Sequence, residues 1–329
     1  MSIGHTPSTE VAAGTAFEIL AGLAATSRVA RDELPAELGA ALGEVGDPEG
    51  ESWLNLLGVP LDAGPPYTAE RLASTLGDLD PVELRRVLLG RYAWSWCTLA
   101  GVDTIDAAAA GDRDAIANLL GHTRYYAGHA ATSLATLLSV DPIETQRRLV
   151  AAVEVASTEL APATAPELAA AADEASALLA AEPALTAIER LTGGYRYVPE
   201  LEAERIVLVP HLERRLPLVL AQHRAARLVV YRATGRQDAQ ERLLALGRAL
   251  ADPKRVEILA LVSRGVGRSS EIVDATGLTR STVHHHLTQL RDAGLVALEG
   301  NARAYTYLPR RAAADEAAAL LEDLIGKEQ

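Results

Sequence analysis

The chain has 329 residues, a formal net charge of −13 and a single cysteine, Cys97. Its length exceeds that of an average domain, so we expect two or more folded units. One cysteine excludes an internal disulfide framework and a paired-cysteine metal site. No run of about eighteen apolar residues occurs, and the first ten residues lack a signal-peptide pattern. We therefore expect a soluble, cytoplasmic protein with no membrane partner.

The first part of the chain, from about residue 9 to residue 191, has the apolar spacing of helices. Capping residues mark several helix starts, as at Thr68, Asp80 and Asp141. The alanine-rich stretch 163–181 is interpreted as a helix packed closely on another helix. We therefore predict a helical N-terminal domain.

Short β-type runs follow this helical region at residues 195–198, 205–209 and 227–231. They predict a small sheet of two or three strands that closes the N-terminal domain, which would span residues 1–235. A charged insert, residues 211–223, separates the last two runs. The expected fold class is mainly α (α+β), with a second, C-terminal domain over residues 236–329.

One set of polar and aromatic residues stands out in the N-terminal domain. It comprises His122, Tyr125, Tyr126 and His129, with Tyr92 and Trp96 on a second expected helix nearby. The i, i+3, i+4, i+7 spacing of the first four predicts one face of a helix. Aromatic walls with polar tips are typical of small-molecule pockets, which makes the set a candidate effector site. The alternative, core residues with their polar tips at the surface, is favoured.

The pattern near residue 280 predicts two short helices joined by a tight turn. Gly277 is expected to end the first helix, because glycine accepts the left-handed conformation common at helix C-termini. Thr279 stands where the N-cap of the second helix belongs. The buried stripe predicted for that second helix consists of Val283, Leu287 and Leu290.

Short or cationic hydrogen-bonding groups lie off that stripe, of the kind that reach base edges and phosphates in a DNA major groove. They are Arg280, Ser281, Thr282, His284, His285 and Thr288. Residues 295–299 and 303–308 have the pattern of two strands around the turn signal Gly300-Asn301. A hairpin directly after such a helix pair indicates a winged helix-turn-helix. Asn301 and Arg303, near the hairpin tip, are further predicted DNA contacts.

The block 249–311 resembles the ArsR family of bacterial transcriptional regulators. The matching segments are ALADPKRVEILALV, GLTRSTVHHHLTQLRDAGLV and the hairpin ending in YTYL. This resemblance lies within the last third of the chain. The layout before it resembles ArsR-like regulators with a longer helical N-terminal domain that ends in a strand of the form Val-Leu-Val-Pro, here residues 207–210.

In that family, the familiar metal-sensing sites use cysteines on the first helix of the turn motif or Asp/His pairs on the last helix. Here the first helix has no thiol and the expected last helix, 311–325, has no histidine, so we expect neither a metal nor a cofactor. Neighbouring histidines of the run 284–286 point about 100° apart on a helix and cannot converge on one ion.

The resemblance also implies a homodimer. Two expected helices carry apolar edges with too few neighbours in their own small domain to bury them. The predicted dimer interface consists of Leu243, Leu246, Leu250, Leu320, Leu321 and Leu324. The alternative for the last helix is docking onto the N-terminal domain.

Charge is unevenly distributed along the chain. Residues 252–311 carry nine Lys and Arg against six Asp and Glu, a net +3 that leaves −16 on the rest. Such a local cationic region favours nucleic-acid binding. We therefore predict a non-enzymatic, homodimeric transcription regulator that binds double-stranded DNA sequence-specifically, modulated by a small-molecule effector in the N-terminal domain. The alternative is a protein-interaction scaffold in which the winged helix binds a protein.

Overall fold

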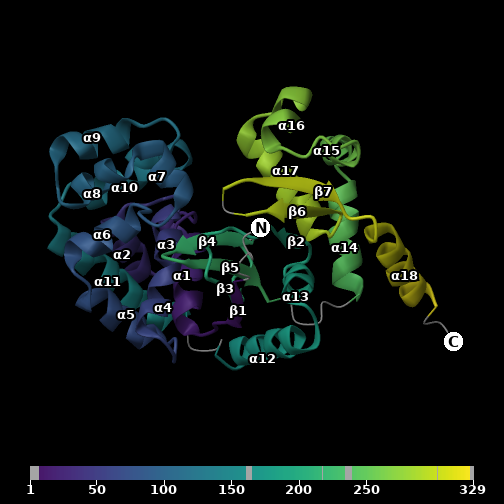
Figure 1. Ribbon diagram of the computed structural model, residues 1–329, viewed down its shortest axis with the longest axis horizontal. Coiled ribbons are helices and arrows are strands. Elements are labelled where there is room, and N and C mark those ends of the chain that lie inside the picture. The colour runs from purple at the N-terminus through teal and green to yellow at the C-terminus, as the bar shows by residue number, and fades with distance from the viewer. Residues whose placement is uncertain (1–6, 161–164, 217, 234–238, 302, 327–329) are drawn as a thin grey trace. The chain divides into compact units, whose positions relative to one another are not determined.

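A computed structural model describes residues 7–160, 165–216, 218–233, 239–301 and 303–326 (Figure 1). The fold is mainly helical, with two small sheets. The chain divides into two compact units. The first, called the N-terminal unit, takes in residues 1–176 and 201–233. The second, called the C-terminal unit, takes in residues 177–200 and 234–329.

Helices make up most of the N-terminal unit. The first group is α1 (Thr15–Thr26), α2 (Ala36–Val45), α3 (Glu51–Asn55), α4 (Val59–Ala63), α5 (Ala69–Asp78) and α6 (Pro81–Leu88). The second is α7 (Trp94–Ala100), α8 (Val102–Ala109), α9 (Arg113–Gly121), α10 (Ala130–Leu138), α11 (Pro142–Leu160) and α12 (Ala165–Ala181), whose last turn belongs to the C-terminal unit. Short 3₁₀ helices are η1 (Arg31–Glu33), η2 (Leu56–Gly58) and η3 (Tyr125–Gly128). The predicted caps are confirmed at Thr68, which accepts from the Arg71 amide, and at Asp80.

A four-stranded sheet completes the N-terminal unit, in the order β1-β3-β5-β4. Its strands are β1 (Ser8–Val11), β3 (Arg205–His211), β4 (Val219–His223) and β5 (Ala226–Arg232). The strands β1, β3 and β5 run parallel, and β4 pairs with β5 antiparallel. Two expectations are therefore corrected. The region expected to be helical from about residue 9 begins with the strand β1, and the charged insert 211–223 contains the strand β4.

Helix α1 lies at the centre of the main core. It is buried from Ala16 to Thr26 and packs against α11, α3, α5 and β3. Because side chains alternate across a strand, Val207 and Val209 of β3 face the same side and join this core. Helix α11 in turn contacts α2, α5 and α6, so helices far apart in sequence share one apolar interior.

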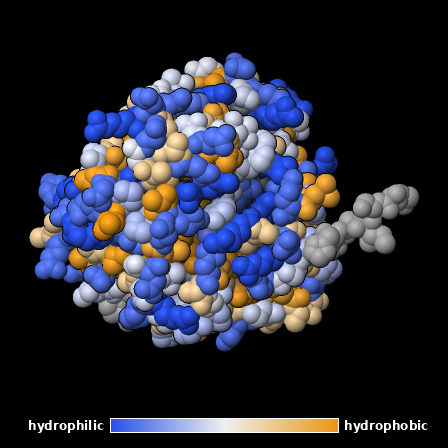
Figure 2. All heavy atoms as spheres, turned by 60° about the vertical axis from the view of Figure 1, so that its left-hand side comes forward, coloured by the Kyte–Doolittle hydropathy of each residue, from blue (hydrophilic) through white to orange (hydrophobic). Residues whose placement is uncertain are grey.

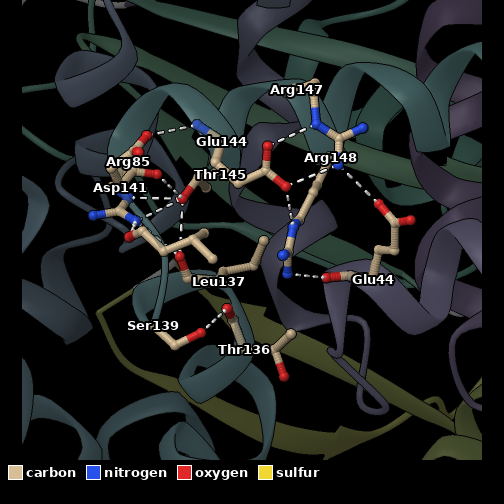
Figure 3. A network of polar contacts seen from close by, with 11 residues as sticks. Glu44, Arg85, Thr136, Leu137, Ser139, Asp141, Glu144, Thr145, Arg147 and Arg148 are labelled. Atoms are coloured by element: carbon tan, nitrogen blue, oxygen red, sulfur yellow. Dashed lines mark hydrogen bonds and ion pairs between the residues drawn. The ribbon is translucent and has the colours of Figure 1, made fainter.

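A buried arginine ties three of these helices together (Figure 3). The Arg85 side chain of α6 is 1 % exposed. Its Nε donates to Thr145 Oγ1 at 2.9 Å, and one terminal nitrogen donates to the carbonyl of Leu137 at 2.8 Å and to that of Val140. Burial lowers the pKa of this guanidinium. Arg85 thus satisfies carbonyls at the C-terminus of α10 that would otherwise lack intrahelical donors.

The surface of the protein carries mixed polarity. Figure 2 shows hydrophilic side chains spread over the face it presents, with hydrophobic ones in small scattered groups. Such scattering is ordinary for a folded surface and marks no single apolar patch on this face. Within the part of the chain that the structure describes, none of the helices has both the length and the apolar character required to span a bilayer.

The C-terminal unit contains six helices among its described residues. They are α13 (Ala184–Leu191), α14 (Ala239–Leu250), α15 (Pro253–Ser263), α16 (Ser269–Thr276), α17 (Arg280–Asp292) and α18 (Ala313–Ile325). Its sheet has the order β2-β6-β7, with β2 (Tyr195–Tyr197), β6 (Val296–Gly300) and β7 (Tyr305–Pro309). Helix α13 packs on β2, and α14 packs on α18.

The strand β2 is placed differently from the sequence-based expectation. The run 195–198 was expected to join the two other N-terminal runs in one sheet. Instead β2 pairs in parallel with β6, with Tyr195 beside Leu298 and Tyr197 beside Gly300. Both tyrosines are buried there, and this burial is the physical reason for the pairing. Residues 177–200 thus belong to the C-terminal unit, whereas the N-terminal domain expected from the sequence runs continuously to residue 235.

Candidate nucleic-acid interface

Two helices of the C-terminal unit meet at a tight turn, as predicted. Gly277 ends α16 in the left-handed conformation, with φ of 67°. Thr279 is the N-cap of α17, and its Oγ1 accepts from the Thr282 amide at 3.2 Å. The same hydroxyl lies 3.0 Å from Ser281 Oγ and 2.8 Å from Thr282 Oγ1. These contacts fix the first turn of α17 and therefore the direction in which its first residues project.

Helix α17 has one buried face and one exposed face. Its buried stripe is Val283, Leu287 and Leu290, each 0 % exposed. This confirms the predicted stripe. On the opposite side Arg280, Ser281, His284 and His285 are exposed, while Thr282 and Thr288 are half-buried. The groups predicted to meet DNA therefore lie off the apolar stripe on a helix whose other side is held in the core.

His286 differs from the two histidines before it. Its side chain is buried, and Nδ1 lies 3.9 Å from Asp252 Oδ2 at the N-cap of α15. Burial lowers the pKa of His286, and the Asp252 carboxylate opposes that shift. His286 therefore packs inside the unit and is not among the exposed groups of α17.

The strands β6 and β7 form the predicted hairpin, with a longer turn than expected. The second strand begins at Tyr305 rather than at residue 303. Asn301 organises the turn, because its Oδ1 accepts from the Arg303 amide at 3.0 Å and from the Ala304 amide at 3.4 Å. Arg303 is thus a turn residue, and its side chain is 35 % exposed.

A segment remote in sequence contacts this hairpin tip. The Asn301 side-chain amide donates to the Val198 carbonyl at 3.2 Å. Arg303 Nε lies 3.6 Å from Oε2 of Glu200, a carboxylate whose side chain is only 2 % exposed. The sequence-based reasoning missed Glu200. The alternating tyrosines of β2 signalled a strand, but a strand pattern does not name its pairing partner.

The predicted dimer surface comes from α14 and α18, which pack on each other. Several apolar side chains there remain exposed, namely Leu244 at 55 %, Leu250 at 43 %, Leu321 at 46 % and Ile325 at 75 %. Leu243, Leu246 and Leu320 are half-buried, and the side chain of Leu324 lies outside the described residues. An ion pair of 3.2 Å between Arg242 and Glu316 joins the two helices. Together they present an apolar edge without a covering element among the described residues of their unit.

The prediction that His122, Tyr125, Tyr126 and His129 share one helical face is wrong. Helix α9 ends at Gly121, and Tyr126 and Ala127 have left-handed φ values of 52° and 55°. Because of this kink, His129 does not lie on the same helical face as His122. Its side chain is half exposed, with Nδ1 4.0 Å from Glu49 Oε1.

The two tyrosines between these histidines are packing residues of the N-terminal unit. Both are 0 % exposed. Their hydroxyls donate to the Leu89 and Leu88 carbonyls, at the end of α6. The Trp96 ring stacks on Tyr126 at 5.7 Å between centroids. His122 Nδ1 accepts from the amides of Arg124 and Tyr125 and so supports the same turn.

Tyr92 belongs to a different cluster from Trp96. Its ring packs edge-on against His223 at 4.9 Å between centroids, and its hydroxyl donates to Glu83 at 3.0 Å. The expected pair on a second helix is therefore split, since α7 begins only at Trp94. Among the described residues, no three His, Cys, Asp or Glu side chains come together in a way that could hold a metal ion.

Two helices at a tight turn, an exposed polar face on the second and a hairpin directly after it define the class of helix-turn-helix proteins. Comparisons with known proteins agree. Residues 252–297 match the family model described as bacterial regulatory protein, arsR family. This match runs from the N-cap of α15 into β6. No solved structure matches the chain.

Several curated relatives cover the same region. The HTH-type transcriptional regulator CmtR of Mycobacterium tuberculosis is 45 % identical over 65 residues, 20 % of this chain and 55 % of CmtR. The HTH-type transcriptional regulator YgaV of Escherichia coli is 33 % identical over 89 residues, 27 % of this chain and 90 % of YgaV. A probable mercury resistance operon repressor of Streptomyces lividans is 36 % identical over 85 residues, 68 % of its length.

The chain spans about half the length of CmtR but nearly all of YgaV. The protein belongs to the ArsR family of bacterial regulatory proteins, through its C-terminal unit.

Proposed function

We propose that this protein is a homodimeric transcription regulator that reads double-stranded DNA with α17, and that the β6–β7 hairpin, called the wing below, lies on the DNA backbone. One observation carries the proposal. The buried stripe of α17 fixes the helix in its unit, while its opposite side presents Arg280, Ser281 and His284 to solvent. A helix that is held on one side and polar on the other suits insertion into a major groove about 12 Å wide.

Separate contacts serve base reading and positioning. Arg280 is the first residue of α17, where a side chain projects toward the groove floor and can bond a guanine through two donors. Ser281, His284 and His285 meet bases or adjacent phosphates, with Thr282 and Thr288 at the edge of the same face. Asn301 and Arg303 belong to the wing, which suits backbone contacts rather than major-groove edges.

The same proposal includes pairing of two chains through α14 and α18. The exposed side chains of Leu250, Leu321 and Ile325 give this edge its apolar character. A two-fold dimer presents two copies of α17, so its DNA site should be a near-palindrome with half-sites about 10–10.5 base pairs apart or a multiple of that. Homodimer formation by several relatively weak apolar contacts also makes DNA binding concentration-dependent.

The N-terminal unit is assigned as the sensor or assembly part of the regulator. The family match lies wholly outside it, so a small-molecule effector is inferred only from the presence of a large second unit. Binding of an effector near Trp96, Tyr125 or His129 stays a prediction. A protein that reads chromosomal DNA works where the chromosome is, and a cytoplasmic location belongs to the proposal for that reason.

The experiment is selection of genomic fragments by the full chain, followed by affinity measurements on the selected site over a salt series. With about 6–10 phosphate contacts, affinity should fall roughly 10³–10⁵-fold between 50 and 200 mM salt. Arg147→Ala is the matched control for Arg280→Ala. It removes an exposed arginine of the N-terminal unit and should leave the affinity for DNA unchanged. A flat salt response with no selected sequence would overturn the proposal and favour the protein-interaction scaffold.

A further inference from the structure

The wing has a third strand that comes from far away in the sequence. Strand β2 lies parallel to β6, and the Val198 amide extends the pairing by donating to the Gly300 carbonyl at 2.9 Å. The Tyr195 hydroxyl donates to the same carbonyl at 3.0 Å. One oxygen at the base of the wing turn therefore accepts two donors from this segment, so the segment is part of the wing.

The segment also brings a carboxylate to the wing arginine. Glu200 follows β2 directly and lies 3.6 Å from Arg303, at the tip of the turn. Its Oε1 lies 3.5 Å from the Tyr197 hydroxyl, which helps to hold the side chain in place. An almost fully buried carboxylate loses much of its hydration and relies on a nearby cation for compensation. Arg303 supplies that cation and is therefore drawn toward Glu200.

The segment that carries Glu200 is joined at both ends to the N-terminal unit. The chain leaves the N-terminal unit after Ser176, contributes residues 177–200 to the C-terminal unit, and re-enters the N-terminal unit at Leu201. Strand β3 begins at Arg205, only a few residues after Glu200. A conformational change at this end of the N-terminal sheet thus has a short covalent path to the carboxylate that holds the wing arginine.

We propose that Glu200 restrains Arg303 in competition with DNA phosphate, so that the N-terminal unit controls wing contact through residues 177–200. The inference rests on the proposed function, because it concerns how strongly the wing meets DNA. With Glu200 in place, a phosphate must draw Arg303 away from a buried carboxylate, which opposes binding. When the segment shifts and Glu200 withdraws, the guanidinium becomes available and affinity rises.

The experiment is a double-mutant cycle in the full chain, read by DNA affinity on the selected site at low salt. Glu200→Gln removes the charge but keeps the shape. It should raise the affinity for DNA about 3- to 10-fold. The slope of log affinity against log salt concentration should steepen by about one, since one more phosphate contact forms. In an Arg303→Ala background the same substitution should change nothing. Glu200→Asp keeps the charge but shortens the side chain, and should give a smaller gain.

Glu189→Gln is the matched control. Glu189 lies on α13 of the same segment and pairs with Arg196 of β2 at 2.8 Å rather than with Arg303 of the hairpin turn, so its loss changes net charge equally. It should leave affinity unchanged. An equal gain from Glu200→Gln with and without Arg303 would overturn the inference, as would a loss of affinity. If Glu200→Gln does not fold, the Glu200→Asp cycle decides by the same criterion. Failure of the wild-type chain to bind DNA would instead overturn the proposed function, and this inference with it.

Discussion

The most quantitative prediction concerns His211, at the end of β3. Its side chain is 0 % exposed, and neither ring nitrogen has a hydrogen-bond partner among the described residues. Burial and, to a lesser extent, the charge of Arg232, its register neighbour on β5, together lower its pKa to about 4. In the unfolded chain a histidine titrates near 6.5.

The sign of the pH effect follows from this difference. The unfolded chain binds a proton at His211 near pH 6.5, whereas the folded N-terminal unit does so only near pH 4. Stability from this group is therefore present above about pH 6.5 and is lost as pH falls toward 4. At about 1.4 kcal/mol per pKa unit, the loss amounts to about 3 kcal/mol. Buried Glu18, whose pKa is raised by burial, acts in the opposite direction, so a variant comparison is required.

The assay is urea unfolding from pH 7.5 to pH 4, followed by tryptophan fluorescence. All three tryptophans, Trp53, Trp94 and Trp96, lie in the N-terminal unit with His211, so the signal reports the relevant unit. His211→Leu removes the titrating group from a site without polar partners. The unfolding free energy of this variant should equal or exceed that of the wild type at neutral pH. The stability difference should then shift by about 3 kcal/mol in favour of the variant as pH falls.

Val209→Ala is the control. Val209 is a buried neighbour on the same face of β3, and its truncation should lower the unfolding free energy by a similar amount at every pH. Wild type and His211→Leu curves that stay parallel over this pH range would refute the reasoning. The conclusion would then be that His211 is hydrated or protonated in the folded protein.

Three further predictions address other parts of the molecule. Arg280→Ala should cost about 1–3 kcal/mol on the selected site and relax sequence preference at one position per half-site, measured by repeating the selection; a uniform loss on all sequences would contradict its assignment to base reading. Arg85→Leu should lower the unfolding free energy of the N-terminal unit by about 1–3 kcal/mol, because the Val140 carbonyl loses its guanidinium donor and the Leu137 carbonyl keeps only Thr145 Oγ1. Stability within about 0.5 kcal/mol of wild type in the same fluorescence assay would argue against that role. Leu321→Asp should shift the full chain toward monomer in sedimentation measurements, since it places a charge on the exposed edge of α18; an unchanged mass distribution would move the interface elsewhere.

Local signals in the sequence were sufficient to predict the two helices and the tight turn of the helix-turn-helix. The end of α16 at Gly277, the cap at Thr279 and the stripe through Val283 are all decided by residues within a few positions of each other. Backbone sterics, capping and helical periodicity act over that range, so a single sequence contains the necessary information. The N-cap at Asp80 followed by Pro81 was predictable for the same reason.

The break in the helix near Tyr126 could be seen only in the structure. The spacing from His122 to His129 is helical, yet the chain turns through left-handed conformations at Tyr126 and Ala127. Hydroxyl contacts from Tyr125 and Tyr126 to the end of α6 hold that turn, and these contacts cross 36 and 38 residues of sequence. Long-range packing of this kind overrides a local pattern.

Strand pairing was decided only by the tertiary structure. The sequence showed that 195–197 is β-type, but a strand's hydrogen-bonding edge accepts any compatible neighbour, and the neighbour here is β6, about 100 residues later. That pairing alone brings Glu200 to Arg303. The sequence by itself therefore determined the helix-turn-helix and the hairpin after it, because those depend on nearby residues. The tertiary structure decided which remote segment completes the wing, because pairing and burial depend on surfaces that exist only after the chain has folded.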